Sequence, residues 1–172
     1  MALRPGTDLA DPTHATKTAL RRLARRIRHL TEEIAQADTD LATLTRTAAP
    51  RTLARFGVGP DCAAQLLTTA GDNPDRLHSE AAFAHLCGVA PIEASSGRTT
   101  KHRLNPAGDR HANAALHRIV IVRLRHCPRT KAYLQKRTTQ GLSKRDIIRC
   151  LKRYLAREIY NALRADHTAL TA

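Results

Sequence analysis

The sequence is poor in aromatic residues and has no long apolar run. Tryptophan is absent, and Phe, Trp and Tyr together make up 3% of the 172 residues. A core must therefore be built from Leu, Ile, Val and Ala, which favours helices over a β-sandwich. The longest strongly apolar run, residues 119–122, is far shorter than the roughly 20 residues that span a bilayer, and the N-terminus lacks the apolar stretch of a signal peptide. We expect a soluble, intracellular protein with no membrane partner.

Cysteine pairs at metal-binding spacing are also missing. The four cysteines are Cys62, Cys87, Cys127 and Cys150, and they form no CxxC motif. This spacing is typical neither of a zinc site nor of a disulfide framework. We expect reduced, mostly buried cysteines and no metal site.

Acidic residues are scarce in the C-terminal part of the chain. Residues 96–172 contain 18 Lys and Arg against four Asp and Glu, whereas residues 1–50 contain eight against six and residues 51–95 three against five. The basic segment thus accounts for the whole formal net charge of +14. Such a block attracts a polyanion by Coulomb steering and counterion release, which favours a nucleic-acid partner. A solvated surface that only promotes solubility is the alternative.

Apolar residues recur at heptad spacing near the N-terminus. They alternate strictly by three and four positions: Leu20, Leu23, Ile27, Leu30, Ile34, Ala37, Leu41 and Leu44. This pattern predicts a coiled-coil helix over residues 16–48, after a flexible leader at residues 1–15, and homo-oligomerisation through residues 20–44. The first half is basic and the second acidic, so antiparallel pairing would bring opposite charges together. A plain helix packed on its own domain is the alternative.

A glycine turn follows the predicted coiled coil. Residues 53–72 have the pattern of a helix, the turn Gly57-Val58-Gly59, and a second helix that starts at Pro60. This pattern resembles a helix-hairpin-helix, whose turn points backbone amides at a phosphate. Gly57 and Gly59 are therefore candidate nucleic-acid-binding residues, because glycine permits positive φ and close approach. An ordinary corner between two helices is the alternative.

The rest of the chain predicts a compact helical domain over residues 51–165 and a tail at residues 166–172. Ser79 can cap a short helix that stops at Gly88, and helices are expected at 111–126, between Pro128 and Gly141, and from Ser143 onward. In the last helix Tyr154 belongs to the expected apolar face and Lys152 to the opposite, basic face. The predicted fold class is all-α: a coiled-coil arm plus a helical domain with a helix-hairpin-helix-like element and one short β-hairpin around residues 88–105.

Three segments, in this order, resemble the C-terminal domain of transposases of the insertion-sequence 110/116/902 group. They are GVGPDCAAQLL, FAHLCGVAPIEASSGRTTKHRLNPAGDRHANAALHRIVIVRLRH and KAYLQKRTTQGLSKRDIIRCLKRYLAREIYNAL. The resemblance covers residues 53–164 and implies a function in DNA transposition in a bacterial cytoplasm, at the nucleoid. In that family a resolvase-like domain with four acidic metal ligands precedes the coiled coil. We expect this chain to lack that domain and to hold no cofactor, with Mg²⁺ needed only alongside the missing domain.

The same resemblance implies a serine nucleophile. The family has a serine directly before a glycine, after a G-[LV]-[AT]-P segment; here Gly88-Val89-Ala90-Pro91 precedes Ser96-Gly97. Ser96 is the matching position, and its neighbour Ser95 is not. The family's serine is implied to attack a DNA phosphodiester while a guide (bridge) RNA selects donor and target. From the residues alone, a Ser-Gly pair in a polar loop is most often a turn.

Basic and titratable side chains surround Ser96 in the sequence. Four cations could bind a phosphate: Arg98, Lys101, Arg103 and Arg110. Three groups could accept a proton: His102, Asp109 and His111. General binding of the DNA backbone is the alternative role for the cations.

Three functions therefore compete. The first is the C-terminal, DNA- and guide-RNA-contacting part of a serine-dependent transposase, which alone would bind DNA but not cut it. The second is a non-enzymatic nucleic-acid-binding protein that uses the glycine turn and the basic tail. The third is a remnant that dimerises with intact copies through its heptads.

Overall fold

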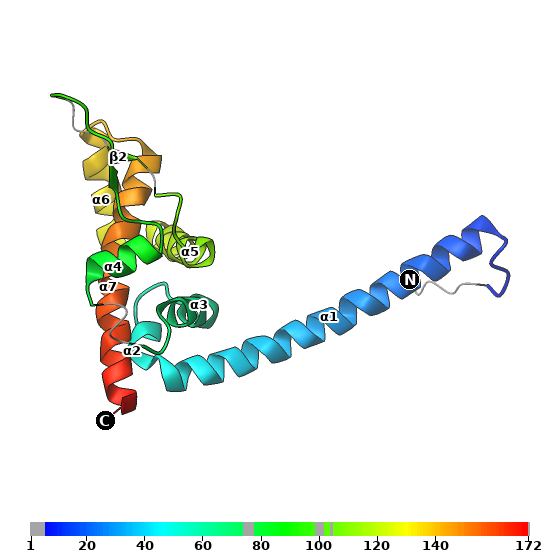
Figure 1. Cartoon of the computed structure of the whole chain (residues 1–172). Helices are drawn as coiled ribbons and strands as arrows, with labels where there is room; N and C mark the ends of the chain where they lie inside the picture. The colour runs from blue at the N-terminus through cyan, green and yellow to red at the C-terminus, as the bar shows by residue number, and fades with distance from the viewer. Residues whose placement is uncertain (1–5, 74–77, 99–101, 104, 172) are drawn as a thin grey trace. The chain divides into compact units, whose positions relative to one another are not determined.

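The structure, a computed structural model, describes residues 6–73, 78–98, 102–103 and 105–171. These ranges contain seven helices and one two-stranded sheet, which confirms the predicted all-α class with a short β-hairpin (Figure 1). In chain order the elements are α1 (Pro12–Ala48), α2 (Pro50–Leu53), α3 (Pro60–Ala70), α4 (Glu80–Leu86), β1 (Ile92–Glu93), β2 (His102–Arg103), α5 (Arg110–His126), α6 (Pro128–Thr139) and α7 (Lys144–Thr171). No helix in the described ranges combines the length and the apolar character that a membrane span requires.

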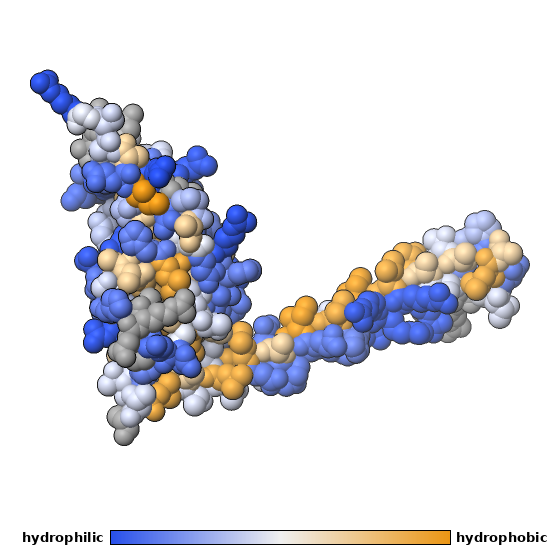
Figure 2. Space-filling model, in the orientation of Figure 1, coloured by the Kyte–Doolittle hydropathy of each residue, from blue (hydrophilic) through white to orange (hydrophobic). Residues whose placement is uncertain are grey.

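The chain divides into two compact units, residues 1–40 and 41–172. Helix α1 supplies the described structure of the first unit almost entirely, and it begins inside the predicted leader because Asp11 caps it. The Asp11 carboxylate accepts a hydrogen bond from the backbone N–H of Thr13 at 2.8 Å, and Pro12 occupies the first helical position. One side of α1 is apolar and the other polar (Figure 2). Ile27 and Ile34 on the apolar side are 64% and 62% exposed.

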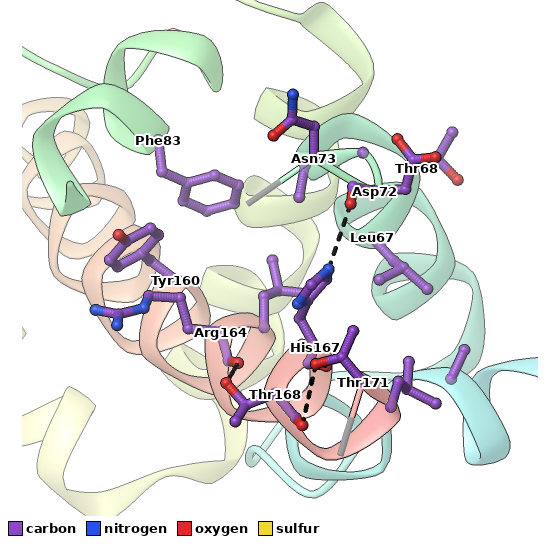
Figure 3. A pocket seen from close by; sticks show the side chains of 15 residues that line it. Leu67, Thr68, Asp72, Asn73, Phe83, Tyr160, Arg164, His167, Thr168 and Thr171 are labelled. Atoms are coloured by element: carbon purple, nitrogen blue, oxygen red, sulfur yellow. Dashed lines mark hydrogen bonds between the residues drawn. The ribbon is translucent and has the colours of Figure 1, made fainter. Parts of the chain in front are cut away.

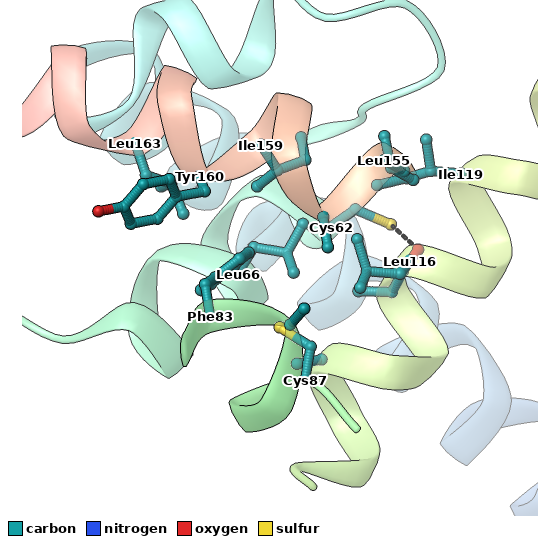
Figure 4. Packing of buried hydrophobic residues seen from close by; sticks show 14 of the residues in the cluster. Cys62, Leu66, Phe83, Cys87, Leu116, Ile119, Leu155, Ile159, Tyr160 and Leu163 are labelled. Carbon is teal, nitrogen blue, oxygen red and sulfur yellow. Dashed lines mark hydrogen bonds between the residues drawn. The ribbon is translucent and has the colours of Figure 1, made fainter. Parts of the chain in front are cut away.

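An aliphatic core holds the second unit together. Leu66 of α3, Phe83 of α4, Leu116 and Ile119 of α5 and Ile159 of α7 are fully buried and meet in one cluster (Figure 4). Leu, Ile and Ala dominate this cluster, as the low aromatic content predicts. Burial of these side chains is the main stabilising contribution to the helical domain.

The four cysteines are free, as predicted. Cys62 and Cys87 are buried in the core, whereas Cys127 and Cys150 are partly exposed. Burial, with a smaller contribution from the charge of Asp109, raises the pKa of the Cys87 thiol to about 12. Cys87 is therefore a neutral, apolar packing group at physiological pH.

Helix α7 is the longest element of the second unit and packs against α2, α4, α5 and α6. Two of its side chains differ from the predicted faces. Tyr154, expected on the apolar face, is 57% exposed, and Lys152, expected on the basic face, is only 9% exposed. The reason is helical periodicity, because residue 152 lies between 148 and 155 on the side that also carries Ile159.

Helix α7 continues to Thr171, through the segment predicted as a tail. Asp166 in this last part is 1% exposed and lies against the start of α2. Its carboxylate accepts hydrogen bonds from the backbone N–H of Arg51 at 2.8 Å, and from the N–H and the hydroxyl of Thr52 at 2.9 and 2.7 Å. Asp166 therefore caps a helix more than 100 residues away in the sequence.

Two glycines bring the ends of one long loop into contact. Gly88 ends α4 with a φ of +64°, and a Cβ atom on Gly108 would overlap the Gly88 backbone. Beside this contact the N–H of Asp109 donates to the carbonyl of Leu86 at 2.7 Å. The two ends of the loop that contains β1 and β2 are therefore in contact at Gly88 and Gly108. The strands pair antiparallel within it, with Ile92 opposite Arg103.

The Asp166 cap should be a main determinant of stability. We expect Asp166→Ala to lower the free energy of unfolding by about 3 kcal/mol, because it leaves two backbone N–H groups and a hydroxyl without their acceptor in a buried place. Chemical denaturation measures the change. Asp61→Ala, which removes the exposed ion pair with Arg118, is the control and should cost about 0.5 kcal/mol or less. Equal losses in the two variants would contradict this assignment.

The contact between Gly88 and Gly108 should tolerate no side chain. We expect Gly108→Ala to destabilise the protein by about 3 kcal/mol, since a methyl group would collide with backbone atoms. Thermal unfolding checks this result. Gly59→Ala makes the matched comparison, because a Cβ there meets nothing within 4 Å and Gly59 has a negative φ of −96°. A Gly108→Ala protein as stable as Gly59→Ala would refute the close approach.

Candidate functional site

The loop between β1 and β2 presents Ser96 to solvent. Ser96 is exposed and precedes Gly97, which adopts a φ of +57° in a turn that also contains Arg98. Glycine adopts this conformation without strain, so the local backbone favours glycine at position 97. An exposed hydroxyl at such a turn can approach a large substrate such as a nucleic-acid strand.

The predicted cations lie on different parts of this loop. Arg98 is exposed two residues after Ser96, and Arg103 is exposed on β2. Arg110 is exposed at the first position of α5, after the loop has closed. Lys101 lies outside the described residues. Arg98 and Arg103 therefore share the hairpin with Ser96, whereas Arg110 belongs to the helix that follows.

Backbone and side-chain hydrogen bonds fix the Gly88-Val89-Ala90-Pro91 segment at the base of the hairpin. The N–H groups of Val89 and Ala90 both donate to the carbonyl of Ala84, at 2.9 and 3.0 Å. The Asn113 amide of α5 donates to the carbonyls of Cys87 and Gly88 at 3.0 and 3.1 Å. The segment is thus tied to both α4 and α5, and the hairpin extends from a rigid base.

Asn113 also connects this base to α7. Its side-chain oxygen accepts a hydrogen bond from the Lys152 ammonium group at 2.7 Å. Burial, and to a lesser degree the charge of Arg149, lowers the pKa of Lys152. Sequence reasoning placed Lys152 on the solvent side; the spacing of residues 148, 152, 155 and 159 was the signal that could have found it.

The three candidate proton acceptors have different environments. His102 and His111 are exposed. The carboxylate of Asp109 caps α5 by accepting from the N–H groups of His111 and Ala112, at 2.7 and 3.2 Å, and from the hydroxyl of Thr69 at 2.7 Å. The Thr69 hydrogen bond, followed by those from the backbone, lowers the pKa of Asp109. Asp109 is therefore a helix cap and a weak base.

The glycine turn packs against α5. Gly57 has a φ of +79°, and a Cβ there would meet the side chains of Val122 and Arg123 at 3.4 Å. Arg123 donates to the carbonyl of Phe56 at 2.8 Å and makes a bidentate ion pair with Glu158 of α7 at 2.7 and 2.9 Å. The hydrogen bond from Arg123 lowers the pKa of Glu158. These contacts give the turn a structural role.

The helix after this turn carries an acid at its start. Asp61 lies in the first turn of α3 and pairs with Arg118 at 2.6 Å. A carboxylate at this position already interacts favourably with the helix N-terminus, where a phosphate would otherwise bind. Nucleic-acid binding by Gly57 and Gly59 stays a prediction.

The second unit also contains a cavity, which lies away from the hairpin. It has a volume of about 720 Å³ and opens between the C-terminal half of α7 and the ends of α3 and α4. Leu67, Phe83, Tyr160 and His167 line it, and the His167 ring nitrogen approaches the carbonyl of Asp72 at 3.3 Å (Figure 3). One arginine, Arg164, and one carboxylate, Asp72, are among its lining residues, so their charges balance and give no excess of positive charge for a phosphate.

Divalent metal would need oxygen or nitrogen ligands brought together by the fold. Within the ranges that the structure describes, no group of three or more His, Cys, Asp or Glu side chains gathers where a metal ion could be held.

Comparison with known families gives a match within the helical domain. Residues 52–135 match the model of a family described as Transposase IS116/IS110/IS902 family. The matched range begins inside α2, ends inside α6, and includes the Gly88-Val89-Ala90-Pro91 segment, Ser96 and the whole of α5. A search of curated proteins finds no match to the chain. The predicted resemblance is confirmed over residues 52–135, which match the IS116/IS110/IS902 family of transposases, and this match supports a role in DNA transposition.

Proposed function

We propose that this chain is the C-terminal, DNA-contacting part of a transposase and that Ser96 is its nucleophile. The observation that carries the proposal is the exposure of Ser96 on a glycine turn, inside the range that matches the family. A serine buried in the core could not reach a DNA strand. Hydrogen bonds at the base of the hairpin join this loop to α4 and α5.

The chemistry is a transesterification at phosphorus. The Ser96 oxygen forms a bond to the phosphorus of a DNA phosphodiester, and one bond from that phosphorus to a deoxyribose oxygen breaks. The serine proton passes to the departing deoxyribose oxygen, which becomes a free hydroxyl. Arg98 and Arg103 on the same hairpin stabilise the extra negative charge that develops on the phosphoryl oxygens.

Ser96→Ala should abolish a covalent protein–DNA adduct and leave DNA binding intact. The expected adduct is a band that survives denaturing electrophoresis after the chain, alone or with a full-length family member, is incubated with terminal DNA of the element. Ser95→Ala is the matched control and should still form the adduct, because the neighbouring hydroxyl is not the nucleophile. Both variants should bind duplex DNA like the wild type, with an affinity that falls steeply as salt rises.

Two results would refute the assignment. An adduct that persists in Ser96→Ala means that another residue attacks the DNA. Duplex binding without any adduct, with and without the full-length protein, favours the alternative of a non-enzymatic nucleic-acid-binding protein.

Structured guide RNA is proposed as a second polyanionic partner. Residues 96–172 carry a net charge of +14, which is spread over the hairpin, α5, α6 and α7. The hairpin holds only part of this charge, so α5, α6 and α7 can bind a second polyanion. A structured RNA transcribed beside the element should compete with duplex DNA in the binding assay. Absence of competition would remove the RNA from the proposal.

Helix α1 is proposed to join two copies of the chain. Its heptad positions are apolar, and Leu23, Ile27 and Ile34 are each about 60% exposed. Such a continuous apolar side on a 37-residue helix is typical of a coiled-coil seam. A second copy would cover it.

Charge favours antiparallel pairing of the two helices. Arg26, Glu33 and Asp40 flank the seam at equivalent heptad positions, and Asp38 flanks its other side. In a parallel dimer Glu33 would face Asp38 of the second copy, which is repulsive. In an antiparallel dimer Arg26 faces Glu33 or Asp40 of the second copy, which is attractive.

Two variants test this dimer by sedimentation equilibrium. Ile27→Lys should convert the dimer to monomer, because it places a charge in the seam, whereas Arg25→Gln outside the seam should not. Arg26→Glu should weaken the dimer roughly fivefold or more, since two attractive pairs become repulsive. A wild-type chain that stays monomeric would contradict dimerisation, and an unchanged affinity in Arg26→Glu would contradict antiparallel pairing.

A further inference from the structure

A second cavity lies beneath the hairpin, distinct from the exposed Ser96 loop. Its volume is about 370 Å³, at the lower end of the range for small-molecule pockets, about 300–1,000 Å³. Residues 88–91 form one wall, β2 another, and the first half of α7 a third. The cavity thus lies between two segments. One is residues 88–91, which anchor the hairpin, and the other is the most basic stretch of α7.

Four cationic side chains are among the described residues that line this cavity. They are Arg103 from β2 and Arg149, Lys152 and Arg153 from α7. Asp146 is the one carboxylate among these lining residues, and it already accepts hydrogen bonds from Arg149 and from the Ser143 hydroxyl, at 2.8 and 2.6 Å. A net positive charge therefore remains, which favours an anionic ligand.

Two of these cations are built into the fold. Lys152 is 9% exposed, and its ammonium group is held by the Asn113 side chain at 2.7 Å. The Nη1 atom of Arg153 is buried and has no hydrogen-bond partner among the described residues. A buried guanidinium N–H without an acceptor is costly, and an anionic oxygen would satisfy it with a charge-assisted hydrogen bond.

The cavity also offers surfaces that suit a nucleobase. Val89, Ala90 and Pro91 give it an apolar wall. Tyr154, which lines it too, is 57% exposed, and its ring is held edge to face against Tyr133 with a centroid distance of 5.9 Å. An exposed, positioned aromatic ring next to arginines is the combination on which bases stack in single-stranded nucleic-acid sites.

We infer that this cavity binds one unpaired nucleotide of a bound nucleic-acid strand, with the base against Tyr154 and the phosphate on Arg149 and Arg153. The inference rests on the proposed function, because the nucleotide belongs to the DNA or RNA that the basic segment binds. A bare phosphate would leave the apolar wall and the tyrosine without a role. A fully paired duplex would keep its bases stacked and out of the cavity.

Free nucleotides test the cavity independently of duplex binding. Isothermal titration of the full chain uses the four deoxynucleoside 5′-monophosphates, the matching nucleosides and inorganic phosphate as probes. Monophosphates should bind more tightly than nucleosides or phosphate. Arg153→Gln and Arg149→Gln should each weaken that binding about tenfold, as loss of a charge-assisted hydrogen bond predicts. Arg145→Gln, an exposed α7 residue outside the cavity with the same change of charge, should bind normally.

Oligonucleotides test the role in a strand. A duplex with one extrahelical nucleotide should bind more tightly than the same duplex fully paired. Tyr154→Ala should remove about fivefold or more of that preference, because base stacking on the ring is lost, while Tyr154→Phe should keep it. Tyr154 is exposed, so neither change should affect folding.

The outcomes separate this inference from the proposed function. Normal binding of duplex DNA with no binding of monophosphates overturns the cavity and leaves the proposed function intact. Monophosphate binding without duplex binding supports the cavity and overturns the proposed function. Equal binding of phosphate and monophosphates, or equal losses in Arg153→Gln and Arg145→Gln, overturns the inference.

Discussion

The Asn113 side chain connects three elements of the second unit. Its amide N–H groups bind the carbonyls at the end of α4, and its oxygen binds the Lys152 ammonium of α7. Each of these groups is removed from water, so leaving any of them unpaired would be costly. The hairpin, α5 and α7 are thus joined through one amide, and the arrangement of the Ser96 loop relative to the basic helix follows from it.

Local signals in the sequence located most of the helices. Ser79 caps α4 by accepting from the N–H of Ala82, Pro128 starts α6, and Ser143 caps α7 through Asp146. In each case a residue acts on its near neighbours, so the sequence alone predicts the boundary. The class of core also followed from composition, because few aromatic residues leave aliphatic side chains to fill it.

Long-range partners could not be predicted in this way. Lys152 has the chemistry of a surface residue, and its burial depends on Asn113, 39 positions earlier, which accepts a hydrogen bond from its ammonium group. Asp166 was predicted to belong to the C-terminal tail, and only the fold shows that it binds the start of α2. Ser96 itself came from family resemblance, since nothing in its local pattern distinguishes it from an ordinary turn. The sequence thus predicted the exposed loop of the candidate site, but it did not predict the residues that support this loop.

Some charged residues of the second unit bind each other within the fold, and others are exposed. Arg123 and Glu158 bind each other and hold the glycine turn, and Asp109 holds the start of α5. The arginines of the hairpin, by contrast, are exposed. A count of basic residues overstates the surface available to nucleic acid, because part of that charge is already neutralised within the fold.

The long-range cap on α2 also has a consequence for synthesis. A ribosome makes residues 50–53 long before residue 166, and a four-residue helix has almost no stability of its own. The N-terminal edge of the helical domain therefore stays unclosed until residue 166 has left the ribosome. The cap on α2 is thus one of the last contacts of this domain to form during synthesis.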